Sequence, residues 1–214
     1  MPLQNRVDPF GELQSVSARG RLLGNRGLLH DQARNIVRPW KTKAWVTCVL
    51  DYGGYQRPVF EPGKYSQLFF LDEATAFAAG HRPCGTCRNE RYRTFKASWL
   101  NANPGAVASD RATITEIDKV LHAERAVSGG AKVTFEARID TLPFGVFIEW
   151  KGSAYLLTET ALLPWSFNGY APAVPRPAAP RPAAHTQVTV LTPASIVRLF
   201  QQGFRPQVDA SASL

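Results

Sequence analysis

Two of the three cysteines in this chain are separated by only two residues, in the segment Cys84-Gly85-Thr86-Cys87. This spacing lets both thiolates reach one tetrahedral Zn²⁺, and the glycine eases the tight turn between them. Redox-active dithiols share the spacing, but they are expected near a strand–helix–strand unit, whereas this motif follows an alanine-rich segment. We therefore interpret Cys84 and Cys87 as metal ligands.

The odd number of cysteines argues against a disulfide framework. The N-terminal segment, MPLQNRVDPFGELQ, lacks the apolar run of a signal peptide, and no later segment has the roughly 18 apolar residues of a membrane span. We expect reduced thiols in a soluble, cytoplasmic protein without a membrane partner.

The residues around the motif resemble a known module. LDEATAFAAGHRPCGTCR, residues 71–88 of the 214-residue chain, is similar to the metal-binding module of the Ada family of DNA methyl-phosphotriester repair proteins. In that family the second ligand pair lies in a pattern close to EAxAAGYRPCxxC. The resemblance implies that Cys84 and Cys87 bind zinc, that Arg82 and Pro83 shape the turn, and that the chain works on DNA.

The first ligand pair departs from this family. Ada proteins have two neighbouring cysteines upstream, whereas this chain has only Cys48 there. Related modules pair an upstream histidine with a cysteine, so the resemblance indicates His30 and Cys48 as the two remaining ligands of a closed structural zinc site. The alternative for Cys48 is a buried apolar cysteine on a strand.

The net charge of +8 is concentrated in the first hundred residues. Residues 1–100 hold 15 Lys and Arg against 8 Asp and Glu, which leaves +7, whereas residues 101–214 hold 10 against 9, which leaves +1. A basic surface attracts polyanions because neutralised phosphates release their counterions, although a generally basic protein has the same composition. With the Ada-like segment, this favours nucleic acid as the partner, DNA more than RNA.

A predicted helix from about Arg88 to Leu100 carries much of this charge. Its aromatic residues recur at helical spacing and form a stripe that we expect to be buried. The basic residues on its other faces are the candidates for contact with nucleic acid: Arg88, Arg91, Arg93 and Lys96.

A second group of chemically able residues lies on a helix predicted over residues 116–127. Glu124 projects into the apolar arc of this helix, where a carboxylate is costly unless it is paired or used. Asp118 and His122 occupy the neighbouring arc, and the three groups suit general acid–base work or a hydrolytic metal site. The alternative is structural: Asp118 caps the helix, Arg125 neutralises Glu124, and His122 is solvated.

Short elements position these residues. Residues 44–52 predict a strand with Cys48 in its middle, followed by a glycine turn. Asp72 is the expected N-cap of a short helix over 73–79, and Gly80 is placed to end it in the left-handed conformation. The cysteine motif follows directly.

The second half of the chain predicts one helix and a small sheet. Thr115 and Asp118 have the form of a capping box. Strands are expected over 132–139, 145–150, 154–158 and 161–165, with a hairpin turn at Lys151-Gly152-Ser153. A last strand over 187–191 leads to a helix with Thr192 as its N-cap and Pro193 at its first position.

These elements predict an α+β fold in which a zinc-knuckle part, with short helices and a hairpin, precedes a helix and a small bent antiparallel sheet or partial β-barrel. The predicted parts are a basic zinc-binding part (1–100), the helix and sheet (101–170), a stiff Pro/Ala linker (171–184), and a terminal strand and helix that pack back on the sheet (185–208).

The preferred hypothesis is a zinc-containing DNA-binding protein of repair or processing. The alternative is a hydrolase or glycosylase directed at nucleic acid or a nucleotide that uses His122 and Glu124, with zinc only structural. A third class, a protein-interaction adaptor using the Pro-rich segment, stays open. The aromatic segment 163–170 suits either stacking on unpaired bases or plugging the end of a barrel.

Overall fold

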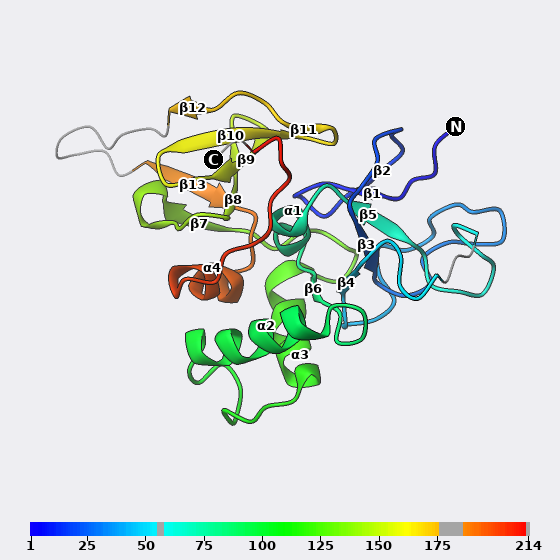
Figure 1. Ribbon diagram of the computed structural model, residues 1–214, viewed down its shortest axis with the longest axis horizontal. Coiled ribbons are helices and arrows are strands. Elements are labelled where there is room, and N and C mark those ends of the chain that lie inside the picture. The colour runs from blue at the N-terminus through cyan, green and yellow to red at the C-terminus, as the bar shows by residue number, and fades with distance from the viewer. Residues whose placement is uncertain (55–57, 176–185, 213–214) are drawn as a thin grey trace.

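The computed structural model describes residues 1–54, 58–175 and 186–212, and these form an α+β fold, as predicted. A six-stranded sheet belongs to the N-terminal half and a seven-stranded sheet to the C-terminal half. Helix α1 lies between the two sheets, and helices α2, α3 and α4 gather on one side of them (Figure 1).

The N-terminal sheet has the strand order β2-β1-β5-β3-β4-β6. Its pairs are antiparallel except for β1 with β5 and β4 with β6, which are parallel. β4 confirms the strand predicted within 44–52, but it is shorter than expected and Cys48 is its last residue rather than its middle. Among the described residues it pairs with β3 and β6 and not with a strand that follows the Gly53-Gly54 turn. The strands are β1 (Arg6–Val7), β2 (Leu13–Gln14), β3 (Leu22–Asn25), β4 (Val46–Cys48), β5 (Leu68–Phe70) and β6 (Arg82–Pro83).

Helix α1 (Glu73–Ala78) connects β5 to β6 and is buried along its whole length. Its N-cap is Asp72, as predicted, and the Asp72 carboxylate accepts hydrogen bonds from the Thr75 amide and hydroxyl at 2.8 and 2.7 Å. Gly80 follows the helix with a φ of +83°, which an L side chain adopts only with strain. The chain therefore turns sharply into β6 and brings the cysteine motif beside β4.

Helices α2 (Asn89–Ala102) and α3 (Ile114–Arg125) follow the motif. The predicted aromatic stripe of α2 is buried at Phe95 and Trp99, which are both fully enclosed, whereas Tyr92 is only partly buried. The predicted capping box of α3 was placed two residues too late. Thr113 is the N-cap, and Glu116 completes the box with its side chain, because glutamate reaches back to the cap amide as this motif requires.

The C-terminal sheet has the order β11-β10-β9-β8-β13-β7, and β12 also pairs with β10. Within the described residues its strand order is open, so it does not close into a barrel. Lys151 and Gly152 have φ values of +52° and +79°, which fits the predicted hairpin turn between β8 and β9. The strands are β7 (Phe135–Arg138), β8 (Phe147–Trp150), β9 (Ser153–Leu157), β10 (Ala161–Ser166), β11 (Gly169–Tyr170), β12 (Val174–Pro175) and β13 (Gln187–Val190).

Helix α4 (Ala194–Gln201) begins differently from the prediction. Its N-cap is Pro193, without a side-chain hydrogen bond of its own, and Thr192 instead accepts the Phe147 amide at 2.9 Å. The cap is supplied by Glu124 of α3, whose carboxylate accepts the Ser195 amide at 3.0 Å.

One large hydrophobic cluster joins the helices to the C-terminal sheet. It contains Phe77 of α1, Trp99 of α2, Ile148 of β8 and Phe200 of α4, among others. The core thus includes residues from both sides of the predicted boundary at residue 100. Of the predicted linker, residues 176–184 lie outside the described residues, while β12 occupies the part before them.

Candidate metal centre

The three cysteines meet at one point of the N-terminal sheet. Cys48 ends β4, Cys84 follows β6, and Cys87 precedes α2. Their Sγ atoms all lie within 4.8 Å of one another. Thiolates around one tetrahedral Zn²⁺ lie about 3.8 Å apart, given Zn–S bonds of about 2.3 Å, so this group has the dimensions of a metal site.

Backbone pairing brings the cysteines together. The parallel pairing of β4 with β6 continues into the motif, where the Cys84 amide donates to the Thr47 carbonyl at 2.9 Å. The Thr86 amide then donates a hydrogen bond to the Cys84 sulfur at 3.4 Å. The Arg88 amide donates to the Cys84 carbonyl at 3.2 Å as α2 begins. The two ligands of the motif and the strand ligand are thereby held on one side of the turn.

The pKa values of the three thiols are shifted in different directions. A hydrogen bond from Cys48 is the main cause that lowers the pKa of Cys84 to about 4, and amides of the turn add to it. The same hydrogen bond raises the pKa of Cys48, and burial raises that of Cys87. One negative charge is thus favoured among three sulfurs, and a soft divalent cation is a chemically matched replacement for the remaining protons.

The cysteines border a cavity of about 570 Å³. Aromatic and aliphatic side chains make up much of its lining, including Tyr52, Tyr65 and Phe69. Among the described residues, no histidine or carboxylate joins the three sulfurs. The group therefore offers three sulfur ligands and leaves a fourth coordination position on the side that borders the cavity.

His30 does not complete the group. Its Nδ1 lies 2.6 Å from the Ser66 hydroxyl, its Nε2 lies 3.2 Å from the Glu61 carbonyl, and its ring stacks on Phe60 at 4.5 Å. Both ring nitrogens are thus occupied, and the structure does not bring this residue to the cysteines. The resemblance pointed to an upstream histidine, but it carried no information on these local partners.

Two of the four predicted nucleic-acid contacts are instead internal. Arg88 is buried, with a hydrogen bond of 2.7 Å to the Glu73 carboxylate and one of 2.8 Å to the Thr47 hydroxyl. Arg91 binds the same carboxylate at 2.6 Å, and the Gln207 amide also donates to it at 2.9 Å. These arginines anchor α2 to α1 and to the C-terminal segment, and they share the single Glu73 carboxylate as their ion-pair partner.

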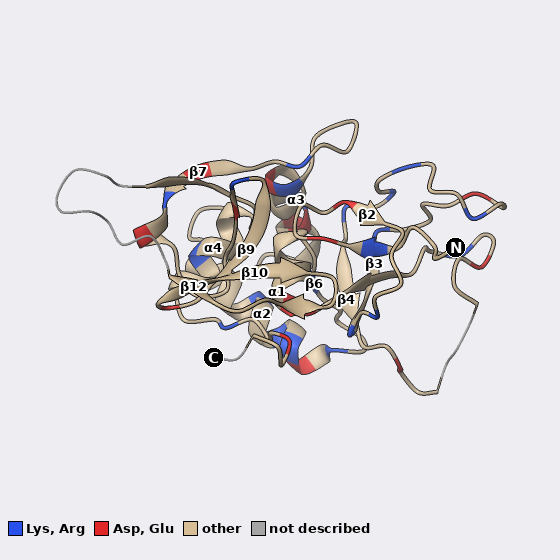
Figure 2. Cartoon of the chain, turned by 90° about the horizontal axis from the view of Figure 1, so that it is seen from above, with Lys and Arg blue, Asp and Glu red and all other residues tan. Residues whose placement is uncertain are grey.

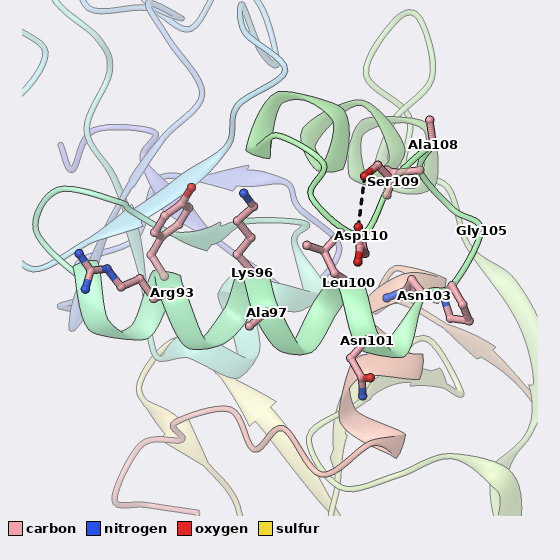
Figure 3. Close-up of a pocket in the computed structure, with 13 residues that line it drawn as sticks. Arg93, Lys96, Ala97, Leu100, Asn101, Asn103, Gly105, Ala108, Ser109 and Asp110 are labelled. Carbon is pink, nitrogen blue, oxygen red and sulfur yellow. Dashed lines mark hydrogen bonds between the residues drawn. The ribbon is translucent and has the colours of Figure 1, made fainter.

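The other two lie at the surface of α2. Arg93 is exposed and Lys96 is half-buried. Both line a cavity of about 870 Å³ between α2 and the loop over 103–110. Asn101 of α2 and Asp110 of the loop are among its other polar lining groups (Figure 3). Within the described part of the chain neither forms an ion pair.

The three residues considered for acid–base work serve separate partners. Asp118 accepts both Nε and Nη2 of Arg82, at 2.8 and 2.7 Å, in a buried ion pair. Glu124 caps α4. His122 contacts the rings of two tryptophans at 4.5 and 6.0 Å, and burial lowers its pKa. They form no common metal-binding group among the described residues.

Sequence reasoning missed the ion pairs that brace the metal centre. Arg82 precedes Cys84 and is fixed by Asp118, while Arg88 follows Cys87 and is fixed by Glu73. The available signal was Glu73 itself, a carboxylate in an otherwise apolar segment, which is costly to bury without a partner.

Comparison with protein-family models, curated proteins and solved structures finds no match to this chain. No helix among the described residues has both the length and the apolar character needed to cross a bilayer.

Proposed function

We propose that this chain is a zinc protein that acts on nucleic acid, with a three-thiolate metal site that has an open fourth position. The observation that carries the metal half is the convergence of three Sγ atoms within 4.8 Å of one another. A DNA role in repair or processing is the narrower form of this proposal, and it rests on the resemblance of residues 71–88 to the Ada module.

Zinc fits the donor set better than harder cations do. Thiolate ligands select soft or borderline metals, whereas magnesium and calcium favour oxygen. Zinc sites with three protein ligands leave room for water or a substrate in the fourth position, whereas closed structural sites have four. The cavity beside the sulfurs supplies that room.

Charge supports the nucleic-acid half. The chain carries a net charge of +8, and Lys and Arg are spread over the N-terminal loops and over α2 and α3 (Figure 2). Arg93 and Lys96 are the members of the predicted set that remain available for phosphate contacts, and exposed Asn101 adds a further polar group to the lining of the cavity beside them.

Metal analysis tests the first half. Protein purified without added zinc is expected to hold one zinc per chain, and Cys84→Ser to lose it. Thr86→Ala, which alters the turn between the two ligands without removing a sulfur, is the matched control and is expected to keep the metal. Absence of zinc from the wild type, or full retention by Cys48→Ala, contradicts the proposed ligand set.

Salt-dependent binding tests the second half. Affinity for duplex and single-stranded DNA is expected to fall steeply with salt, and Arg93→Ala with Lys96→Ala to reduce the slope of log K against log[salt] by about 1.4–1.8, since each contact contributes about 0.7–0.9. The control pair is Lys64→Ala with Lys151→Ala, both at exposed positions. An unchanged slope excludes Arg93 and Lys96 as phosphate contacts. The same sequences made as RNA test the preference for DNA.

The hydrolase alternative lacks a geometric basis. Glu124 is engaged at the start of α4 and Asp118 by Arg82, so neither is placed beside His122 to act on a shared substrate. We retain zinc-dependent nucleic-acid binding as the function that the geometry supports best.

A further inference from the structure

Arg26 meets two cations from a distant part of the chain, Arg125 and Lys132, near Trp45. Arg26 and Arg125 are each 2% exposed, and their guanidinium carbons both lie 4.2 Å from the centre of the Trp45 ring. The Lys132 ammonium donates to the Ala78 carbonyl at 2.7 Å. Among the described residues none of the three forms an ion pair, although buried cations are normally paired.

Both guanidinium groups have an unused donor. Arg26 donates through Nε to His81 at 3.2 Å and through Nη1 to the Gly11 carbonyl at 3.0 Å, but its buried Nη2 has no partner. Arg125 donates through Nη1 and Nη2 to the carbonyls of Gly80 and Lys43, and its buried Nε has no partner. An unmade hydrogen bond of a buried charged group costs stability, so a further acceptor at these two donors is favoured.

Nearby carboxylates do not supply that acceptor. Asp8 favours the charged forms of Arg26 and Lys132, but it forms no ion pair with them and accepts the Glu12 amide at 3.0 Å. Asp118 acts in the same way on Arg125, yet its two oxygens are held by Arg82. Asp8 is therefore the unpaired carboxylate that acts on Arg26 and Lys132, whereas the carboxylate that acts on Arg125 is already paired with Arg82.

Burial, with repulsion from other cations at Arg125 and Lys132, lowers the pKa values of the three cations. Burial lowers the pKa of Arg26 and of Arg125 to about 9, and repulsion from Arg26 and Arg82 adds to the effect at Arg125. Burial, together with repulsion from both arginines, lowers the pKa of Lys132 to about 7. An anion among them favours the charged form of each cation and so opposes these shifts.

A cavity of about 640 Å³ reaches these cations from the junction of the two halves of the chain. Arg26, Arg125 and Lys132 all line it, and exposed Arg38 adds a fourth positive charge. Much of the remaining wall is apolar, with Phe10, Leu13 and Leu191 among its members. Two carboxylates, Glu12 and Glu149, also border the cavity.

We propose that this cavity is a binding site for a phosphate monoester, with the phosphate held by Arg26, Arg125 and Lys132 and the organic part lying against the apolar wall. A phosphate monoester carries about −1.5 to −2 charges and three strong acceptor oxygens, which matches the excess of cations and the unused donors. The volume lies in the range of about 300–1,000 Å³ that small-molecule sites occupy. Glu12 and Glu149 disfavour a second phosphate. The site depends neither on the metal centre nor on DNA binding by α2.

Titration calorimetry and thermal unfolding test this site with inorganic phosphate, AMP and adenosine at constant ionic strength set by sodium chloride. Phosphate and AMP are expected to bind saturably and to raise the melting temperature, and adenosine is expected to do neither. Lys132→Met removes one charge-assisted contact and is expected to weaken AMP binding about tenfold or more. Lys119→Met, at an exposed position on α3, is the matched control and is expected to bind as the wild type does.

Two further arms identify the source of the phosphate. Preference for a 5′-phosphorylated over a 5′-hydroxyl oligonucleotide, lost in Lys132→Met, assigns the site to a nucleic-acid end. AMP binding without that preference assigns it to a free monoester. Both outcomes support the site.

Proton uptake keeps the test independent of how the variant folds. Binding at about pH 8 is expected to take up protons in the wild type, measured from heats in buffers of different ionisation enthalpy, because phosphate raises the pKa of Lys132. Absence of saturable binding by phosphate and AMP below about 10 mM, or undiminished AMP binding by Lys132→Met, overturns the proposal.

Discussion

Replacing Glu73 with glutamine measures how much a buried ion pair contributes to the free energy of unfolding of this protein. The Glu73 side chain is 1% exposed and faces Arg88 at 2.7 Å and Arg91 at 2.6 Å. Its carboxylate also accepts the Gln207 amide at 2.9 Å. Glutamine keeps the size of the side chain, but it removes the negative charge and presents an amide donor toward two guanidinium groups.

The expected loss follows from the desolvation of the partners. Removing one member of a buried ion pair costs about 3–5 kcal/mol, because the remaining charge stays out of water. Glu159→Gln is the matched control, since Glu159 binds Arg205 at the same 2.6 Å but both side chains are more than half exposed, at 67% and 57%. An exposed pair of this kind contributes about 0–1 kcal/mol.

Urea unfolding followed by tryptophan fluorescence measures both variants, since the chain has five tryptophans. With a slope of about 2 kcal/mol per molar urea, a loss of 4 kcal/mol lowers the midpoint by about 2 M. Glu159→Gln is expected to shift it by about 0.5 M or less. If Glu73→Gln costs no more than its control, burial does not set the strength of these ion pairs and Glu73 does not anchor α2.

Three further changes have defined outcomes. Lys132 has a folded-state pKa of about 7 against about 10.4 in the unfolded chain, so the unfolded chain binds more protons between these values. The free energy of unfolding without phosphate is therefore expected to rise from pH 7 to pH 10 more steeply in the wild type than in Lys132→Met, and parallel curves from urea titrations contradict this. Removing zinc with a chelator is expected to lower the melting temperature of the wild type by about 5–10 °C, if free zinc is about 100-fold above its Kd. The chelator is expected to leave the melting temperature of Cys48→Ser unchanged, and scanning calorimetry of both proteins measures the two shifts. Glu124→Gln weakens the cap of α4 at Ser195 and is expected to cost about 0.5–2 kcal/mol, with faster amide exchange confined to the first turn of α4, whereas a loss spread over the whole chain argues against a local cap.

Elements with a strong local pattern were predictable from the sequence. The spacing of aromatic residues identified α2, and the Asp72 to Gly80 segment identified α1, because capping and helical periodicity depend only on neighbouring residues. The start of α3 was misplaced because two overlapping segments have a capping-box form, and only the one at Thr113 ends in glutamate. The start of α4 escaped prediction because its cap is supplied from α3.

The candidate site was predictable in part for the same reason. The two-residue spacing of Cys84 and Cys87 was enough to predict them as a pair of ligands. Cys48 reaches them through the pairing of β4 with β6, which no local pattern specifies. Arg88 looked like a surface cation because its partner Glu73 lies 15 residues away in the chain, and the cations around Trp45 come from segments about 100 residues apart. Charge alone does not distinguish a buried cation from an exposed one.

The placement of α1 limits how this protein can be divided by engineering. Its Phe77 belongs to the core of the C-terminal half, Thr75 accepts the Trp165 indole at 3.0 Å, and Asp72 accepts the Tyr170 hydroxyl at 2.7 Å. The turn that follows α1 leads to the cysteines. A fragment that ends near residue 100 keeps all three sulfurs but exposes this apolar helix to water, so the segment that carries the cysteines is not a cassette that can be cut out and fused to another protein.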